Sequence, residues 1–511
     1  MSASLKRRID GTMSAPAAAR MFYLTLGITT VIKFWLAAAI PLTGDEAYFW
    51  LWGQYPSWGG FYDHPPMVGW WVWALDKMFH APWALRLPAI LLWILIACGM
   101  MDLLRRLAPD DPAKPWCLGS LFLALPFTWA FNLIATDTPL ILFVFFSGYA
   151  FIRGEHSGRL AWHALAGILL GLALLSKYFA GMLAIAFAVY LVTRGPSGWS
   201  RLILIAVCAS PFMILNLVWN AYHCWDNFLF NLFNRNEDSQ IGIKLLLLYV
   251  GMMLYLVTPW VAWRLARRGL WQQNGALLAI FAVPLGLFFA ISLFKTVGLH
   301  WVMAFLPFLF IWASLTLDTR ALLADRRLTL WFGVPHIILL GLLAHLPASF
   351  LPLGKFHTDI TAHRDTRTLF EQFVADLPAG NALMSPSYSL ASMLSYHGRT
   401  HVSVFGTGSY HGRFDDSLTD FSSYDGKSIR IVSTRRLDPS ELEPFFSAVR
   451  VKQHILNDAT FWIADGDGFR FARYRDERLR AVATTYYRMP DWLPLKSCRF
   501  LDRYGFAREP R

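Results

Sequence analysis

Long apolar runs dominate the first two thirds of the chain. A helix of about 20 apolar residues spans the hydrocarbon core of a bilayer. By this measure the chain has eleven candidate membrane helices, at residues 21–41, 84–107, 116–135, 138–153, 161–176, 179–193, 201–219, 244–263, 274–294, 301–317 and 328–350. Three of them, the fourth to the sixth, are short. The pattern therefore predicts a polytopic α-helical membrane domain with about eleven spans.

The first apolar run follows the basic residues Lys6, Arg7 and Arg8, an arrangement also found in secretory signal peptides. The run is about 20 residues long and begins after a lead of about 20 residues, which is too long for a cleaved signal. We therefore expect it to be a retained helix.

The last third of the chain has a different pattern. Residues 352–511 contain 41 charged side chains, whereas the longer stretch 1–351 contains 39. Helical periodicity alternates there with strand-like segments, with helices expected at 364–377 and 387–397 and strands at 382–384, 401–404 and 429–432. We expect two domains, a transmembrane domain over 1–351 and a small extracytoplasmic α/β domain over 352–511.

Composition agrees with a membrane protein. The chain is 56% hydrophobic and 16% charged, whereas a soluble domain usually has about 25% charged residues. Disorder and a disulfide scaffold are excluded, because neither is compatible with this apolar content and five cysteines. The cysteines show no metal-binding spacing and do not indicate a redox compartment.

Basic residues are distributed unevenly between the two sides of the predicted bundle. With the N-terminus in the cytoplasm, 17 Lys and Arg of the membrane part lie on the cytoplasmic side, and its six on the outer side are Lys77, Arg86, Lys177, Arg235, Lys244 and Lys295. This is the positive-inside distribution, and it places loop 42–83 and residues 352–511 outside. The net charge of +12 then reflects topology and lipid contact, and nucleic acid is not an expected partner.

The first outer loop contains acidic and aromatic residues. It includes Gly44-Asp45-Glu46-Ala47-Tyr48 and then Tyr62-Asp63-His64-Pro65-Pro66. Helices at 46–54 and 66–79 are expected to lie in the membrane interface, where Trp and Tyr are favoured. A carboxylate beside a membrane helix is costly and suggests function. As an alternative, Asp45 is the N-cap of a helix that begins at Glu46.

Asp137 is the charged residue of a tight outer turn, Ala135-Thr136-Asp137-Thr138-Pro139, where an N-cap is again the alternative. Carboxylates on one face are suited to general-base chemistry. A divalent-metal site that includes His64 is a further alternative, although no spacing demands a metal and no cofactor is firmly implied.

Cations complete the outer face. Lys177, Arg235 and Lys295 each lie at an outer turn, and each alone is typical of an interfacial snorkelling residue. Together with the acids they predict a polar pocket for an anion such as a lipid phosphate. The sequence has no Gly-rich phosphate loop, so a nucleotide donor is not supported.

These motifs resemble the polytopic GT-C glycosyltransferases of the protein-mannosyltransferase superfamily. The nearest branch is the bacterial group that contains the aminoarabinose and galacturonic acid transferases of lipid A and its core. The resemblance extends over most of residues 21–310. It implies a polyprenyl-phosphate sugar as donor, transfer on the extracytoplasmic face of the bacterial inner membrane, and lipid A, LPS core or another envelope glycan as acceptor.

The resemblance also assigns roles by position. Asp45 would be the catalytic base, with Glu46 beside it and Asp137 as a second outer carboxylate. The donor phosphate would be held by a set of basic and aromatic residues, namely Arg235, Lys177, His64, Tyr62 and Lys295. Asp63, Tyr48 and His300 would lie toward the acceptor. His64 departs from the aminoarabinose transferases, which have a Lys near this position.

Two alternatives remain open. A protein O-mannosyltransferase would differ only in its acceptor. A polyprenyl-lipid flippase or transporter would also have eleven or twelve helices, but its ionisable residues would lie near the midplane of the membrane.

Overall fold

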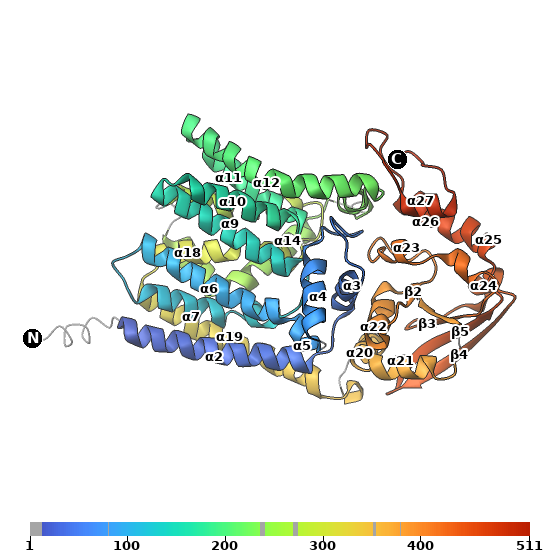
Figure 1. Cartoon of the computed structure of the whole chain (residues 1–511). Helices are drawn as coiled ribbons and strands as arrows, with labels where there is room; N and C mark the ends of the chain where they lie inside the picture. Colours follow the sequence, from blue (N-terminus) through green and yellow to red (C-terminus); the bar gives the residue numbers. More distant parts are fainter. Residues whose placement is uncertain (1–12, 80, 236–240, 269–273, 351–353, 379) are drawn as a thin grey trace, which may run out of the picture. The chain divides into compact units, whose positions relative to one another are not determined.

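The computed structural model describes residues 13–79, 81–235, 241–268, 274–350, 354–378 and 380–511. Contacts divide the chain into two compact units. The first, here called the helical unit, comprises residues 1–39, 83–214 and 239–342. The second, here called the mixed unit, comprises residues 40–82, 215–238 and 343–511. Figure 1 shows the elements of each unit by their labels.

The helical unit is a bundle of apolar helices. Its helices, some of which end outside it, are α2 (Ala15–Ala39), α5 (Pro82–Leu85), α6 (Leu87–Leu107), α7 (Lys114–Ala124), α8 (Pro126–Ala130), α9 (Asp137–Ser157), α10 (Leu160–Leu174), α11 (Gly181–Val192), α12 (Pro196–Tyr222), α14 (Ile243–Val257), α15 (Pro259–Arg268), α16 (Gly275–Ile291), α17 (Leu299–Val302), α18 (Leu306–Thr316) and α19 (Thr319–His345). In Figure 1, α9 lies against α6 and α10. Each predicted apolar segment overlaps at least one of these helices.

Four helices of the described chain are long and apolar enough to cross a membrane, at Ala15–Ala39, Pro82–Leu107, Pro196–Tyr222 and Thr319–His345. A fifth span results if α14 and α15 are counted as one, although they are bent by 94°. Shorter apolar helices of 10–17 residues account for several other predicted segments. The protein is therefore a multi-pass membrane protein, and the number eleven stays a prediction.

Two predicted spans are not continuous helices. Segment 116–135 is divided between α7 and α8 at Leu125, which is extended and precedes Pro126. Segment 244–263 is broken at Thr258, which has a φ of 72° and precedes Pro259. Proline disfavours helical geometry in the residue before it, so the prediction of uninterrupted helices at these two places is wrong.

Aromatic side chains fill the core of the helical unit. The Trp93 ring lies 5.3 Å from that of Phe127, and the Phe145 ring lies 5.3 Å from that of Phe308. Gly148 permits this packing, because a Cβ there would lie 2.4 Å from Cζ of Phe308. Several helices of the unit therefore share one packed apolar interior.

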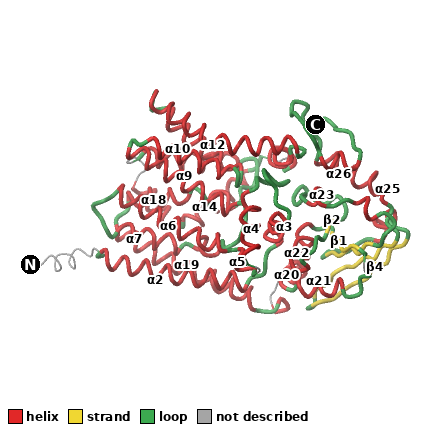
Figure 2. Tube along the Cα trace, in the orientation of Figure 1, coloured by secondary structure: helices red, strands yellow, loops and turns green. Residues whose placement is uncertain are grey.

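The mixed unit contains a five-stranded sheet with the order β2-β1-β3-β5-β4. The strands are β1 (Ala382–Ser385), β2 (Ser403–Val404), β3 (Ile429–Ser433), β4 (Ala448–Leu456) and β5 (Ala459–Asp467). The first three are parallel, and β5 pairs antiparallel with β3 and β4. Figure 2 shows these strands in yellow. The predicted small α/β region is present, and the hairpin of β4 and β5 is an addition to the prediction.

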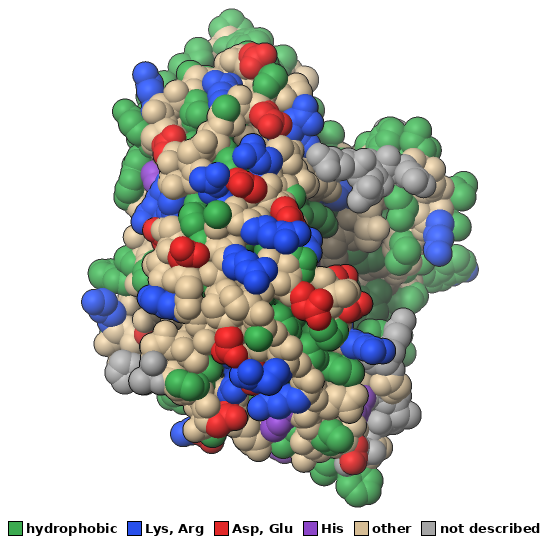
Figure 3. All heavy atoms as spheres, turned by 90° about the vertical axis from the view of Figure 1, so that its right-hand side faces the viewer, with side chains coloured by type: hydrophobic (Ala, Val, Ile, Leu, Met, Phe, Trp, Pro, Cys, Tyr) green, Lys and Arg blue, Asp and Glu red, His purple; other side chains and the backbone are tan. Residues whose placement is uncertain are grey.

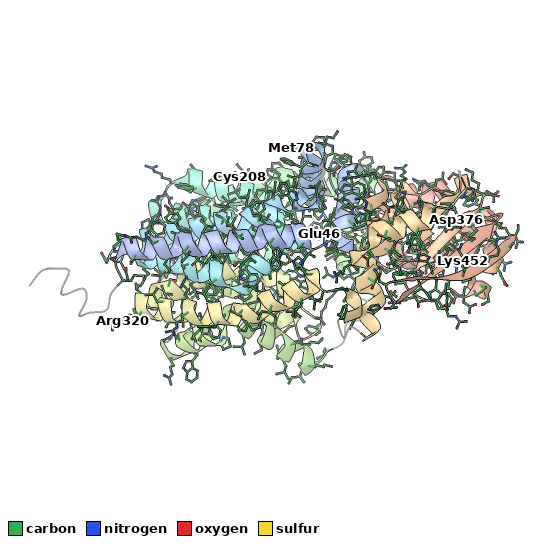
Figure 4. The ribbon with its side chains drawn as sticks, turned by 90° about the horizontal axis from the view of Figure 1, so that it is seen from below. Glu46, Met78, Cys208, Arg320, Asp376 and Lys452 are labelled. Atoms are coloured by element: carbon green, nitrogen blue, oxygen red, sulfur yellow. A yellow bond between two sulfur atoms is a disulfide. The ribbon has the colours of Figure 1, made fainter. Side chains whose placement is uncertain are left out.

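Short helices surround the sheet. They are α20 (His357–Arg364), α21 (Thr366–Val374), α22 (Tyr388–Gly398), α23 (Asp415–Leu418), α24 (Pro439–Leu442), α25 (Phe471–Tyr474), α26 (Arg480–Tyr486) and α27 (Arg499–Tyr504). Charged side chains of both signs are interspersed on the face in Figure 3. Figure 4 labels one such pair, Lys452 and Asp376, whose Nζ and Oδ2 atoms lie 3.5 Å apart.

The two expected helices of the first outer loop belong to the mixed unit. They are α3 (Gly44–Gln54) and α4 (Met67–Met78). Asp76 of α4 accepts hydrogen bonds from Trp50 Nε1 at 3.1 Å and from Arg399 Nη1, beyond the end of α22, at 3.1 Å. Helix α22 packs closely on α3. A Cβ on Gly44 would lie only 1.7 Å from Oγ of Ser389, so the close approach requires glycine at position 44. The first loop is thus held against the C-terminal region.

Candidate active site

Helix α3 begins with a complete capping box. The Thr43 hydroxyl accepts a hydrogen bond from the Glu46 N–H at 3.3 Å, and the Glu46 carboxylate accepts one from the Thr43 N–H at 3.0 Å. Glu46 is buried, in the first turn of α3 (Figure 4). The alternative that Asp45 is the N-cap is therefore wrong, because Thr43 has the extended backbone and the hydroxyl that the cap requires.

Asp45 is exposed in the first turn of α3. Its Oδ1 accepts a hydrogen bond of 2.9 Å from the hydroxyl of Tyr388, the first residue of α22. Burial, and then the charge of Asp45, raise the pKa of Tyr388. Tyr388 therefore stays a hydrogen-bond donor, and the carboxylate remains open to a substrate on its other side.

Tyr48 and Asp63 form a buried pair beside α3. The Tyr48 hydroxyl donates to Oδ2 of Asp63 at 2.6 Å and accepts from the N–H of Phe414 at 3.1 Å. Asp63 is 4% exposed. Burial raises the pKa of Asp63 to about 7, against the opposing effect of the Tyr48 hydrogen bond. This carboxyl group therefore changes between its protonated and ionised forms near neutral pH.

Asparagines of residues 216–234 hold the loop that contains Asp63. Their amide groups donate mainly to backbone oxygens of the loop, with the pairs Asn216 to Gly59 O (2.7 Å), Asn227 to Tyr62 O (3.1 Å), Asn231 to Asp63 O (3.1 Å) and Asn234 to Tyr62 Oη (3.0 Å). Sequence reasoning missed this clamp. The available signal was the spacing of four residues between Asn216 and Asn220 and again between Asn227 and Asn231, which places each pair on one face of a helix.

His64 and Arg235 both lie close to the same aromatic ring. The His64 ring centroid is 5.6 Å from that of Phe230, in an edge-on arrangement. The Arg235 guanidinium lies 5.9 Å from the Phe230 ring centroid. Two of the residues that the resemblance assigns to the donor phosphate are thus placed around one side chain of the mixed unit.

The helical unit contains a second polar group, at the start of α9. Lys177 Nζ lies 2.8 and 3.0 Å from the two carboxylate oxygens of Asp137. Nε2 of His300 lies 3.8 Å from Asp137 Oδ2. Asp137 is 3% exposed and Lys177 is 5% exposed. Thr136 is the N-cap residue of α9, so the N-cap alternative for Asp137 is wrong.

The predicted site residues fall into two groups. Those of the mixed unit are Asp45, Glu46, Tyr48, Tyr62, Asp63, His64 and Arg235. Those of the helical unit are Asp137, Lys177, Lys295 and His300, with Lys295 half-buried after the end of α16. Among the described residues, no group of three or more His, Cys, Asp or Glu is arranged to hold a metal ion.

Comparisons with known proteins give the same family resemblance. A family model described as dolichyl-phosphate-mannose-protein mannosyltransferase matches residues 63–219. The fold resembles that of ArnT from Cupriavidus metallidurans in the apo state, with a TM-score of 0.59, 16% identity, and coverage of 86% of this chain and 97% of that chain. The predicted resemblance to polytopic GT-C glycosyltransferases is confirmed.

ArnT from the same organism bound to undecaprenyl phosphate matches with a TM-score of 0.61, 16% identity and the same coverage of both chains. At this identity the likeness shows a shared fold. No curated protein sequence matches the chain. The family match over residues 63–219 bears out the prediction that the protein is a glycosyltransferase.

Proposed function

We propose that the protein transfers a sugar from a polyprenyl-phosphate donor to a hydroxyl group of an extracytoplasmic glycan. Lipid A, LPS core or another envelope glycan is the acceptor. The observation that carries the proposal is the exposed Asp45 carboxylate, which Tyr388 holds in the first turn of α3. The solved ArnT structure with undecaprenyl phosphate supports a lipid-phosphate donor, because that protein has the same fold.

The chemistry requires one base and one stabilised leaving group. Asp45 takes the proton of the acceptor hydroxyl while that oxygen forms a bond to the anomeric carbon. The bond from the anomeric carbon to the phosphate oxygen breaks, and the polyprenyl phosphate leaves with the electron pair. A single displacement of this kind inverts the anomeric centre. Glu46 supports the base through the capping box that orients the first turn of α3.

Cations stabilise the charge on the departing phosphate, because fixed positive groups in a poorly hydrated site act strongly on a developing anion. We assign this role to Arg235, His64, Lys177 and Lys295, with Tyr62 as a hydrogen-bonding neighbour. Asp137 already lies against Lys177, so we assign Asp137 to positioning that cation. Asp63, Tyr48 and His300 are assigned to the acceptor side.

We further propose that residues 1–351 form the transmembrane domain of a bacterial inner-membrane enzyme, and that the catalytic loop and residues 352–511 are extracytoplasmic. The disulfide between Cys224 and Cys498 supports this location, because disulfides persist in oxidising compartments.

A protein acceptor is the second candidate. The matching family model, over residues 63–219, is described by transfer of mannose to protein. Envelope glycans and glycoproteins of a deletion strain, compared by mass spectrometry, distinguish the two: loss of a sugar from the glycan supports the first acceptor and loss from proteins supports the second.

The donor is tested with purified protein in lipid nanodiscs. We expect sugar transfer from a polyprenyl-phosphate sugar and none from the corresponding nucleotide sugar, with Asp45→Asn as the matched inactive control. Transfer from the nucleotide sugar while the lipid donor is inert would refute the proposal.

A further inference from the structure

A cavity of about 940 Å³ lies in the mixed unit, and apart from Tyr62 the proposed chemistry uses none of its lining residues. Its walls come from three separate stretches, residues 54–62, 219–226 and 413–500. Small-molecule sites typically have volumes of about 300–1,000 Å³. The cavity is therefore large enough for a ligand of two sugar rings.

Covalent and hydrogen bonds fix two of the walls to one another. The Cys224–Cys498 disulfide joins them. The Ser497 hydroxyl donates to the carbonyl of Tyr222 at 2.7 Å, and the Cys224 N–H donates to the carbonyl of Ser497 at 3.3 Å. A cavity with such walls is preformed, so ligand binding does not include a free-energy cost of ordering them.

Aromatic rings line the cavity and remain accessible. Tyr55, Trp58 and Tyr222 are 43%, 48% and 49% exposed. The face of an aromatic ring carries partial negative charge, which attracts the weakly positive C–H groups on the flat side of a sugar ring. Half-exposed rings around a cavity are thus suited to stacking against saccharides.

Asp226 adds an unsatisfied acceptor to the same cavity. Its Oδ1 is buried and has no hydrogen-bond partner among the residues that the structure describes. A buried polar atom without a partner is unfavourable, and a ligand hydroxyl that reaches the Asp226 carboxyl group from the cavity would offer it a hydrogen bond. The other lining carboxylate, Asp416, is already paired with Arg413 at 2.7 and 2.9 Å.

We infer that this cavity binds a hydroxyl-rich saccharide unit of the acceptor, with its ring on Trp58 and a hydroxyl group on Asp226. The inference rests on the proposed function. An acyl chain would leave Asp226 unsatisfied. Tyr62 lines the cavity and precedes Asp63, so the bound saccharide lies against the loop that contains the proposed site.

Binding of free disaccharides to the full-length protein in nanodiscs tests the inference, using saturation-transfer NMR and a panel that varies in hydroxyl stereochemistry. We expect saturable binding by at least one disaccharide. Trp58→Ala should weaken it by up to about tenfold, since an aromatic contact is worth about 0.5–1.5 kcal/mol. Asp226→Leu, which removes both acceptor oxygens and nearly keeps the size, should also weaken it.

Trp492→Ala is the matched control, because Trp492 is 70% exposed and does not line the cavity. Absence of saturable binding, or equal binding by all variants, would overturn the inference. A measurement of lipid-donor hydrolysis in the absence of acceptor separates the saccharide site from the proposed function. Donor hydrolysis without disaccharide binding refutes the saccharide site alone, whereas disaccharide binding without any donor turnover refutes the proposed function and leaves the site.

Discussion

The hydroxyl of Tyr388 donates a hydrogen bond to the carboxylate of Asp45 across 343 positions of the sequence. The contact joins the first turn of α3, in the first outer loop, to the first residue of α22, in the C-terminal region. Tyr388 also lies edge-on to Tyr48, with ring centroids 5.5 Å apart. The C-terminal region thus contributes a residue that orients the proposed base.

The base assignment predicts a graded effect. Asp45→Asn keeps the size of the side chain but removes its proton affinity, so turnover should fall by about 10²–10⁴-fold while donor affinity is retained. Tyr388→Phe should lower turnover by roughly tenfold, because a hydrogen bond to a charged group is lost. Tyr396→Phe, on the same helix, is the control. If Asp45→Asn turns over normally while Asp137→Asn is inactive, then Asp137 is the base.

The capping box predicts a structural role for Glu46. Glu46→Gln should retain both stability and turnover, because glutamine also accepts the Thr43 N–H. Thr43→Ala removes the cap and should cost about 1 kcal/mol. Thermal unfolding and single-turnover rates of both variants provide the check. A Glu46→Gln protein that is stable and inactive would show that Glu46 takes part in the chemistry.

Asp63 predicts a pH dependence of stability. Its pKa rises from 3.8 in the unfolded chain to about 7 in the folded protein, so between these values the folded state binds more protons. The free energy of unfolding therefore falls as pH rises from about 4 to about 7, by a few kcal/mol in order of magnitude.

Asp63→Asn should flatten this slope, as measured by thermal unfolding at pH 5 and pH 8. Asp491→Asn, at an exposed position, is the control. The same slope in wild type and Asp63→Asn would refute the assignment to Asp63.

The Lys177–Asp137 ion pair predicts a loss of stability when one partner is removed. Breaking a buried pair typically costs about 3–5 kcal/mol, because a charge is left without compensation. Lys177→Met and Asp137→Leu should each lower the unfolding temperature, and the double variant should recover much of it. If Lys177 binds the phosphate, the donor KM of the double variant should be higher than that of the wild type even though its stability is recovered. Normal donor use by that protein would limit Lys177 to a structural role.

The distribution of basic residues predicts the topology. Alkaline phosphatase fused after residue 360 should be active, since that enzyme requires an extracytoplasmic location, and a fusion after residue 109 should be inactive. An inactive fusion at 360 would reverse the orientation and contradict the extracytoplasmic site.

Local signals in the sequence were sufficient for much of the fold. Apolar runs located the helices, and aromatic residues with Pro66 located α3 and α4. The strand-like segments near 382, 403 and 429 are strands of the sheet. These elements were accessible because each depends on the period and composition of a short stretch.

Interactions between distant residues were not accessible in this way. Nothing near Asp45 specifies Tyr388, and nothing near Cys224 specifies Cys498, 274 positions away. The hairpin of β4 and β5 was not predicted from the sequence. Its turn residues, Asn457 and Asp458, have positive φ values in the structure, which Asn and Asp adopt more readily than most residues. The alternative of Asp45 as the cap of α3 fails because the hydroxyl of Thr43, two residues earlier, accepts the hydrogen bond of the Glu46 N–H.

The contact between Gly44 and Ser389 also limits how this protein can change. A methyl group at position 44 would collide with the Ser389 hydroxyl, and the resulting displacement of α22 would pull Tyr388 away from Asp45. The two positions are therefore coupled: in a chain that retains this arrangement, a side chain at position 44 requires a residue smaller than serine at position 389. Paired substitution at 44 and 389 is a signature by which descendants that keep the tyrosine–aspartate contact can be distinguished from those that have lost it.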